Sequence, residues 1–190
     1  MSRRTYRQTR RAEAAEETRR RIVQATFNLH AEQGIAATSM KQIADRAGVG
    51  VGSVYNHMGT YEEAVRACGE FTAREFPMPD ASCFDDAADP GTRIGLLAAA
   101  LFEYYEKLPV LERLRVEPTP LPTVRDFLAE EDRKRADLVR KALRLRRTAD
   151  RRVRLVSALL DVGTYRSLRR AGYDTAQCAE EISNVVSFQL

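Results

Sequence analysis

The chain contains 190 residues, of which 44% are hydrophobic and 31% are charged, a composition typical of a globular protein with one or two hydrophobic cores. It has no run of about 18 apolar residues, which excludes a membrane-spanning helix, and its charged first 21 residues exclude a secretory signal, so we expect a cytoplasmic protein without a membrane partner. The net charge of +4 is unevenly placed, since residues 1–60 carry ten Lys and Arg against five Asp and Glu, whereas residues 61–190 carry 21 against 22. A basic end on a near-neutral body favours a polyanion partner held at that end, with a merely solvated basic tail as the alternative.

Helices are predicted along the whole chain, because no sustained β-branched alternation and no Asn-Gly or Asp-Gly hairpin turn occurs. Residues 1–15 are predicted to be a flexible basic arm. A first helix is predicted over residues 17–33, where apolar side chains recur at helical spacing and Gly34 follows as a stop. The capping-box sequence Ser39-Met40-Lys41-Gln42 predicts a second helix that ends near Ala47.

After a glycine-bearing turn, a short third helix is predicted over residues 53–58, and a second capping box predicts a fourth helix over residues 60–76. Residues 77–89 are polar and contain two prolines, as in a loop. Five further helices are predicted over residues 90–107, 110–116, 124–147, 150–171 and 174–190. The expected fold is therefore all-α with about nine helices, divided into the arm, a three-helix domain over residues 16–65 and a helical domain over residues 66–190.

Residues 39–58 have the features of a helix-turn-helix, in which two short helices cross at a steep angle. The helices meet at the tight turn Ala47-Gly48-Val49, and the small apolar residues Ile43, Ala44 and Val54 supply the contacts between them. In a helix-turn-helix the second helix enters the major groove of DNA, and its first residues reach the base edges. DNA binding is therefore the function that this segment predicts.

The same stretch, over residues 18–65, resembles the DNA-binding domain of the TetR family of transcriptional regulators. The residues that match the family's pattern are Ser39, Ile43-Ala44, Ala47-Gly48-Val49, Gly52-Ser53-Val54-Tyr55 and His57, with Ile22, Ala25, Leu29 and Gly34 in the first helix. The resemblance implies an all-helical homodimeric repressor. It also implies a C-terminal domain that binds a small molecule and then releases an inverted-repeat operator in double-stranded DNA.

Four positions depart from the family pattern. Gly50 stands where a serine usually caps the DNA-reading helix, Met58 and His30 replace phenylalanines, and Tyr61 replaces a lysine that contacts phosphate. Met58 and His30 keep bulk at expected core positions, and His30 is predicted to be buried. The Tyr61 change removes a positive charge, so the family's phosphate contact is not carried over unmodified.

The predicted DNA-reading surface lacks positive charge, because residues 50–61 contain neither Lys nor Arg. Asn56 has the donor and acceptor that an adenine edge requires, and Ser53 suits several bases. Tyr55 and His57 are placed to stack on sugar or bind phosphate, with packing inside the domain as the alternative. The predicted DNA-binding residues are Ser39, Lys41, Gly52, Ser53, Tyr55, Asn56, His57 and Tyr61. We expect the attraction for phosphate to come from the arm, Arg19, Arg20, Lys41 and the helix starts near Ser39 and Gly52.

The last two predicted helices carry more apolar surface than one monomer core needs. A helix that is apolar on two faces needs two partners, so we expect a four-helix bundle formed with a second copy, the homodimer that the resemblance also implies. The alternative is that both helices are central in the monomer. The predicted interface residues are Val156, Leu160, Gly163, Ile182, Val185 and Val186. Such a dimer sets two DNA-reading helices about one turn of DNA apart, or somewhat more.

An interior that binds an unidentified small-molecule effector is implied by the family resemblance. The predicted lining residues are Leu97, Leu101, Tyr104, Tyr105, Phe127 and Leu159. Tyrosine hydroxyls among apolar side chains are suited to orient a ligand. The alternative is that these side chains simply fill the core.

The sequence has no catalytic or phosphate-binding motif, so it is not predicted to be an enzyme, and no metal or cofactor is expected. Its three cysteines, Cys68, Cys83 and Cys178, show no metal-ligand spacing and are expected to be reduced thiols. The arginine-rich run over residues 140–154 is interpreted as a solvated, partly ion-paired face. The competing class is a helical protein-interaction or ligand-carrier module, which the uncharged DNA-reading helix leaves open.

Overall fold

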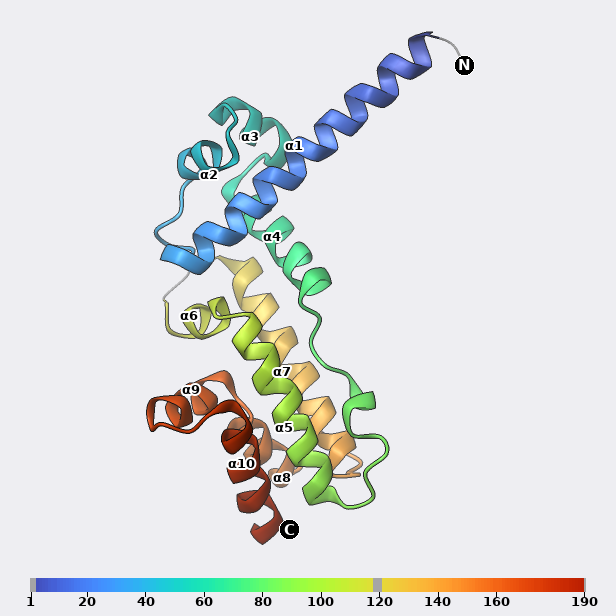
Figure 1. Cartoon of the computed structure of the whole chain (residues 1–190), viewed down its shortest axis with the longest axis vertical. Helices are drawn as coiled ribbons and strands as arrows, with labels where there is room; N and C mark the ends of the chain where they lie inside the picture. Colours follow the sequence, from blue (N-terminus) through green and yellow to red (C-terminus); the bar gives the residue numbers. More distant parts are fainter. Residues whose placement is uncertain (1–2, 118–120, 190) are drawn as a thin grey trace. The chain divides into compact units, whose positions relative to one another are not determined.

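The computed structural model describes residues 3–117 and 121–189, and within them it is all-helical, as predicted. The described chain contains ten α-helices and one short 3₁₀ helix (Figure 1), where nine helices were expected. Their bounds are α1 Arg3–Gln33, α2 Met40–Ala47, α3 Val51–Met58, α4 Tyr61–Glu75, η1 Ala81–Phe84, α5 Pro90–Lys107, α6 Val110–Val116, α7 Pro122–Ala142, α8 Arg151–Leu159, α9 Val162–Arg170 and α10 Thr175–Gln189. None of the described helices combines the length and the apolar character that crossing a membrane requires.

The chain forms two compact units. The first comprises the described residues up to Glu75 together with Glu117–Val124, and the second comprises Phe76–Val116 and the described residues from Arg125 onward. The division falls at Glu75, rather than at residue 65, because α4 packs Ala64 and Ala67 into the core of the first unit.

The core of the first unit is built from one face of each of the helices α1 to α4. Its buried residues are Ile22, Val23, Ala25, Leu29, Met40, Ile43, Ala44, Ala47, Val54, Met58, Ala64 and Ala67. α1 packs against α2 and α4, and α2 packs against α3. Because this core includes the small apolar residues singled out in the helix-turn-helix, it holds α2 and α3 as the pair that the sequence predicts.

The described part of α1 contradicts the prediction of a flexible arm, because the helix begins at Arg3 and continues without a break to Gln33. This stretch contains neither Gly nor Pro and is rich in Ala, Arg, Glu and Gln, which are strong helix formers. Residues 7–17 are exposed, so local preference rather than tertiary packing forms the first turns. Gly34 follows the helix with a φ of 87°, in the left-handed region, as the predicted stop requires.

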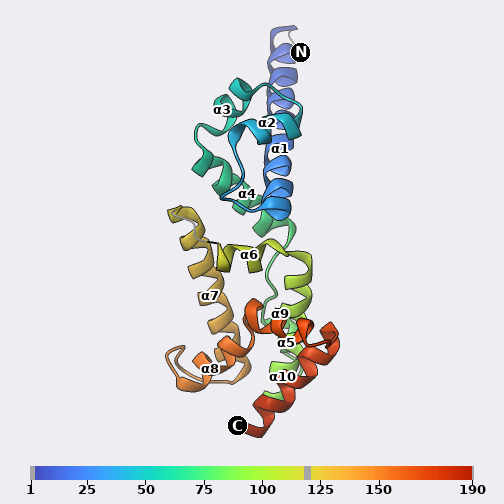
Figure 2. The same ribbon diagram turned by 90° about the vertical axis from the view of Figure 1, so that its left-hand side faces the viewer.

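In the second unit, α5 and α10 pack closely against each other (Figures 1 and 2). A Cβ atom at Gly95 of α5 would lie 2.8 Å from Oγ of Ser183 in α10, so the absence of a side chain permits this approach. The buried Arg93 joins α5 to the end of α7, since its Nε donates to the carbonyl of Ala142 at 3.1 Å. α7 ends at Ala142, earlier than predicted, and Arg144 follows it with a left-handed φ of 54°.

The single helix predicted over residues 150–171 is instead two helices, α8 and α9, separated at Leu160 and Asp161. The Asp161 carboxylate accepts the backbone N–H of Gly163 at 2.8 Å and so acts as the N-cap of α9. The side chain of a capping aspartate bonds to the backbone and so competes with continuation of the helix. The spacing of apolar residues alone does not reveal such a break.

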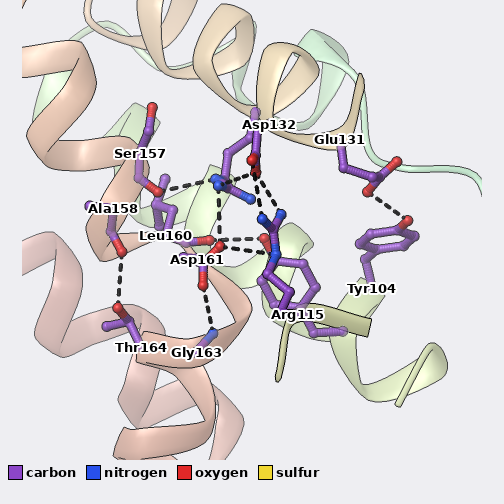
Figure 3. Close-up of polar contacts among 12 residues, drawn as sticks. Tyr104, Arg115, Glu131, Asp132, Ser157, Ala158, Leu160, Asp161, Gly163 and Thr164 are labelled. Carbon is purple, nitrogen blue, oxygen red and sulfur yellow. Dashed lines mark hydrogen bonds and ion pairs between the residues drawn. The ribbon is translucent and has the colours of Figure 1, made fainter. Parts of the chain in front are cut away.

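Side chains also satisfy the carbonyl groups that the break releases from helical bonding. The hydroxyl of Tyr105 donates to the carbonyl of Leu160 at 2.9 Å, and Nε of Arg135 donates to that of Ser157 at 3.1 Å. The Thr164 hydroxyl donates to Ala158 at 2.9 Å (Figure 3). The break is therefore a built feature of the second unit.

Candidate DNA-binding surface

The first helix of the motif, α2, begins at a complete capping box, as predicted. The Ser39 hydroxyl accepts the backbone N–H of Gln42 at 3.3 Å, and the Gln42 side chain accepts the backbone N–H of Ser39 at 2.9 Å. Ser39 and Lys41 are both exposed. The helix ends at Gly48, whose φ of 65° places the chain in the left-handed region and turns it toward α3.

The second helix of the motif, α3, starts at Val51, two residues earlier than predicted. Gly50 precedes it in an extended conformation with no side-chain cap, whereas the backbone N–H of Ser53 already bonds to the Gly50 carbonyl at 2.9 Å. The first backbone N–H groups of α3 therefore carry the positive end of the helix dipole without a capping side chain. This compensates in part for the absence of Lys and Arg in the helix, because helix starts attract phosphate.

α3 presents one face to the core and the opposite face to solvent. Val54 and Met58 are buried, whereas Asn56 and Gly52 are exposed and Tyr55 keeps 52% of its surface exposed. A Cβ atom at Gly52 would meet no atom within 4 Å, so a DNA backbone has room to approach this position. The predicted residues Gly52, Tyr55 and Asn56 thus lie together on one accessible surface.

Ser53 and His57 lie at the edge of that surface and are half-buried. The carbonyl of His57 accepts a hydrogen bond from the Arg19 guanidinium at 3.1 Å, and the same guanidinium contacts the sulfur of Met58 at 3.7 Å. Arg19, which the sequence suggested as a source of attraction for phosphate, therefore also fixes the end of α3 against α1.

The side chain of Tyr61 is half-buried, and its hydroxyl makes contacts inside the domain, so its predicted contact with DNA stays a prediction. Its hydroxyl donates to the carbonyl of Ile35 at 2.6 Å and lies 3.1 Å from Nε2 of His30. Because its only proton is used on Ile35, the Tyr61 oxygen accepts from His30, which places the imidazole proton on Nε2. Burial raises the pKa of Tyr61 to about 12 and lowers the pKa of His30 to about 4, so both are neutral at pH 7.

Tyr61 and His30 both depart from the family pattern and lie 31 residues apart in sequence. In the structure they contact each other inside the domain. The predicted burial of His30 is confirmed, with 3% of its surface exposed. The sequence alone could have indicated this contact, because His30 and Tyr61 are two polar departures from the family pattern in the same domain.

A concave polar surface lies between α1 and α2 beside the motif. It has a volume of about 290 Å³ and is lined by Arg20, Arg21, Gln24, Ala25, Asn28, Arg46 and Ala47. Arg20 and Arg46 form ion pairs with Glu17 and Glu32, at 2.9 and 2.7 Å. These exposed pairs are weak in water, so the arginines remain available to exchange a carboxylate for a phosphate.

Comparison with known proteins identifies this part of the chain. Residues 22–67 match the family model of bacterial regulatory proteins of the tetR family. The matched range begins in α1, contains α2 and α3 and ends in α4. The N-terminal domain is of the TetR family. The resemblance inferred from its motif residues is confirmed.

Two curated relatives of the TetR-family domain are transcriptional regulators. The HTH-type transcriptional repressor KstR of Mycobacterium tuberculosis is 31% identical over 103 residues, which cover 53% of this chain and 46% of the relative. The HTH-type transcriptional regulator SrpR of Pseudomonas putida is 37% identical over 67 residues, which cover 35% of this chain and 30% of the relative. The chain therefore spans less than half the length of each of these relatives.

Solved structures extend the likeness to a TetR-like fold in both units. A TetR-like transcriptional regulator from Rhodococcus sp. RHA1 gives a TM-score of 0.66 at 17% identity, over 89% of this chain and 93% of the other. The multidrug binding protein EbrR complexed with proflavin gives a TM-score of 0.64 at 21% identity, over 91% and 99%. At these identities the comparison establishes the fold.

In the second unit of this TetR-like fold, the predicted effector-lining residues fall in and around the core. Leu97, Leu101, Tyr104 and Tyr105 are buried, and Phe127 and Leu159 are half-buried. Both tyrosine hydroxyls are already used, that of Tyr105 at the helix break and that of Tyr104 on the Glu131 carboxylate at 2.9 Å (Figure 3). Burial raises the pKa of the Glu131 carboxyl.

Beside these tyrosines lies an ionic cluster that the sequence analysis missed. Asp161 lies 3.2 Å from Arg135 and 3.5 Å from Arg115, and Asp132 lies 2.7 and 2.5 Å from the same two arginines (Figure 3). The pKa of Asp132 is lowered, because these hydrogen bonds and charges outweigh its partial burial. The cluster ties α6 and α7 to the break between α8 and α9.

The residues predicted at the dimer interface divide into two groups. Val156, Leu160, Ile182 and Val186 are buried within their own unit, whereas Gly163 and Val185 are exposed. A groove of about 380 Å³ is lined by Arg151, Arg152, Leu155, Val156, Leu159, Val185 and Val186. Leu155 and Val185 keep 50% and 48% of their surface exposed, so α8 and α10 do present an apolar surface outward.

Proposed function

We propose that this chain is a DNA-binding transcriptional regulator, a repressor that binds an inverted-repeat operator as a homodimer and leaves it when a small molecule binds. The single observation that carries the proposal is the surface of α3, where Asn56, Tyr55 and Gly52 are exposed on a helix held by a buried core. A helix so held enters the major groove as one rigid piece. The TetR-family domain and the two regulator relatives support the same function.

The experiment is selection of a binding site from random duplex DNA, followed by mobility-shift titration of the selected operator. We expect an inverted repeat, and we expect Asn56→Ala to weaken operator binding by about 10- to 100-fold for each half-site, the discrimination of one bidentate base contact. Asn184→Ala makes the same chemical change at an exposed position of α10 and serves as the matched control. Recovery of no sequence from the pool would contradict the proposal and favour a module without DNA binding.

The proposed homodimer follows from the groove on α8 and α10. A second copy would cover Leu155 and Val185 and place its own arginines at the rim, as in a two-fold interface. Such symmetry is what gives an operator with two inverted half-sites.

The proposed effector binds within the second unit, beside Tyr104 and Tyr105. EbrR, which has a similar fold, has been solved with proflavin and with imidazole, and this supports the proposal that a small molecule binds this fold. A ligand releases DNA only if it prefers the conformation that does not fit the operator. Screening compounds for release of labelled operator tests this, and a true effector also raises the melting temperature of the protein in the absence of DNA.

A further inference from the structure

The amino-terminal half of α1 is helical although its described side chains are not packed into a hydrophobic core. Residues 7–17 are exposed, and the described turns from Arg3 to Glu17 span about 22 Å at 1.5 Å per residue. In both Figure 1 and Figure 2 this half of α1 extends beyond α3, which belongs to the same compact unit. DNA seated on α3 would therefore have the helix beside it.

The direction in which its arginines point follows from helix geometry. Eighteen residues make five complete turns at 3.6 residues per turn, so residues 18 apart point the same way. Arg7 therefore lies directly in line with Ala25, and Arg11 with Leu29. Ala25 and Leu29 are buried in the core formed with α2 and α3, so Arg7 and Arg11 face the side of α1 that carries the helix-turn-helix.

Charge is segregated along the same helix. At 100° per residue, Glu13 and Glu16 lie within about 40° of the direction opposite to Arg11. The side that faces the motif is therefore basic and the far side acidic. α3 itself has no Lys or Arg, so this basic side is complementary to the phosphates that flank the groove which α3 would occupy.

We propose that the amino-terminal half of α1 is a rigid helical arm whose Arg7 and Arg11 bind backbone phosphates of duplex DNA next to the half-site read by α3. The inference rests on the proposed function, since it needs DNA on α3. At about 22 Å the arm exceeds the roughly 12 Å width of the major groove, so it extends the contacted DNA beyond the bases that α3 reaches. Its contacts are to phosphate, so they add affinity without adding base specificity.

The test compares three variants of the full chain on the selected operator. Arg7→Gln with Arg11→Gln should lower the slope of log affinity against log salt by about 4, one for each of the two phosphate contacts in each protomer of the proposed dimer, and remove hydroxyl-radical protection outside the half-sites. Arg146→Gln with Arg147→Gln makes the same two changes of charge at exposed positions of the second unit and should leave both the salt slope and the flanking protection intact. Ala14→Pro keeps every charge but breaks the helix between the arm and the domain, and should also remove the flanking protection.

Each outcome decides the inference. If the wild-type chain binds its operator and the double arginine variant keeps both the salt slope and the flanking protection, the arm does not bind DNA. If the double variant loses them but Ala14→Pro does not, the contact comes from a flexible tail and the helical arm is overturned. Failure of the wild-type chain to bind any operator would instead contradict the proposed function, so the two failures are distinguishable. Because residues 7–17 are exposed, unchanged melting temperatures will show that the variants fold.

Discussion

The contact between Tyr61 and His30 shows how single residues decide what belongs to the DNA-binding surface. Tyr61→Phe removes one of the two donors to the Ile35 carbonyl, which keeps the Thr38 N–H at 3.2 Å, and it takes from the buried His30 the hydroxyl oxygen that accepts from Nε2. We expect it to lower the free energy of unfolding by about 1–3 kcal/mol, measured by urea denaturation. Operator affinity under folding conditions should stay unchanged, and a large loss of affinity would return Tyr61 to the DNA-contacting residues.

His30 also predicts a dependence of stability on pH. Its pKa is lowered from 6.5 to about 4 by burial, so the unfolded chain binds this proton more readily than the folded chain. Stability contributed by neutral His30 is therefore present above pH 6.5 and is lost as the pH falls toward 4. Between pH 7 and pH 5, wild type should lose about 2 kcal/mol more than His30→Phe, measured by urea denaturation at both values. Equal losses in the two proteins would show that His30 does not titrate in this way.

At the scale of elements, the break between α8 and α9 depends on Asp161. Asp161→Ala removes the N-cap of α9 and leaves Arg135, with 9% of its side chain exposed, without one of its two carboxylates. We expect a loss of about 3 kcal/mol in the free energy of unfolding. Asp150→Ala removes the N-cap of α8, where the carboxylate accepts the Arg152 N–H at 2.9 Å, and should cost about 1 kcal/mol. Equal losses for the two variants would mean that the ionic cluster adds nothing to the cap.

The same elements show which helix boundaries could be predicted from the sequence and which could not. The capping box at Ser39 and the stop at Gly34 were predictable because each depends on residues a few positions apart. The division of α8 from α9 was not, because the donors that satisfy it, Tyr105 and Arg135, come from other helices. The extent of α1 was misjudged for a different reason, since its many charges suggested a tail although its residues favour helix. The internal contact of Tyr61 was not predicted, because its partner His30 lies 31 residues away.

At the scale of the whole molecule, the proposed function requires two copies of the chain. Val185→Asp puts a charge into the groove of α8 and α10 and should convert the dimer to monomer, measured by sedimentation equilibrium. Leu96→Asp makes a comparable change at an exposed apolar residue of α5, with 43% of its surface accessible, and should leave the dimer intact. A dimer that survives Val185→Asp would place the interface elsewhere.

If α3 enters the major groove as proposed, it reads bases there through Asn56. The most direct measurement is a cycle that combines Asn56→Ala with an operator in which 7-deazaadenine replaces one adenine in each half-site, since this base lacks the N7 acceptor that a bidentate asparagine uses. At one position of the half-site, wild type should lose affinity for the modified operator and Asn56→Ala should not. If both proteins lose the same affinity at every adenine, or neither loses any, Asn56 does not read the sequence and α3 does not bind bases in this way.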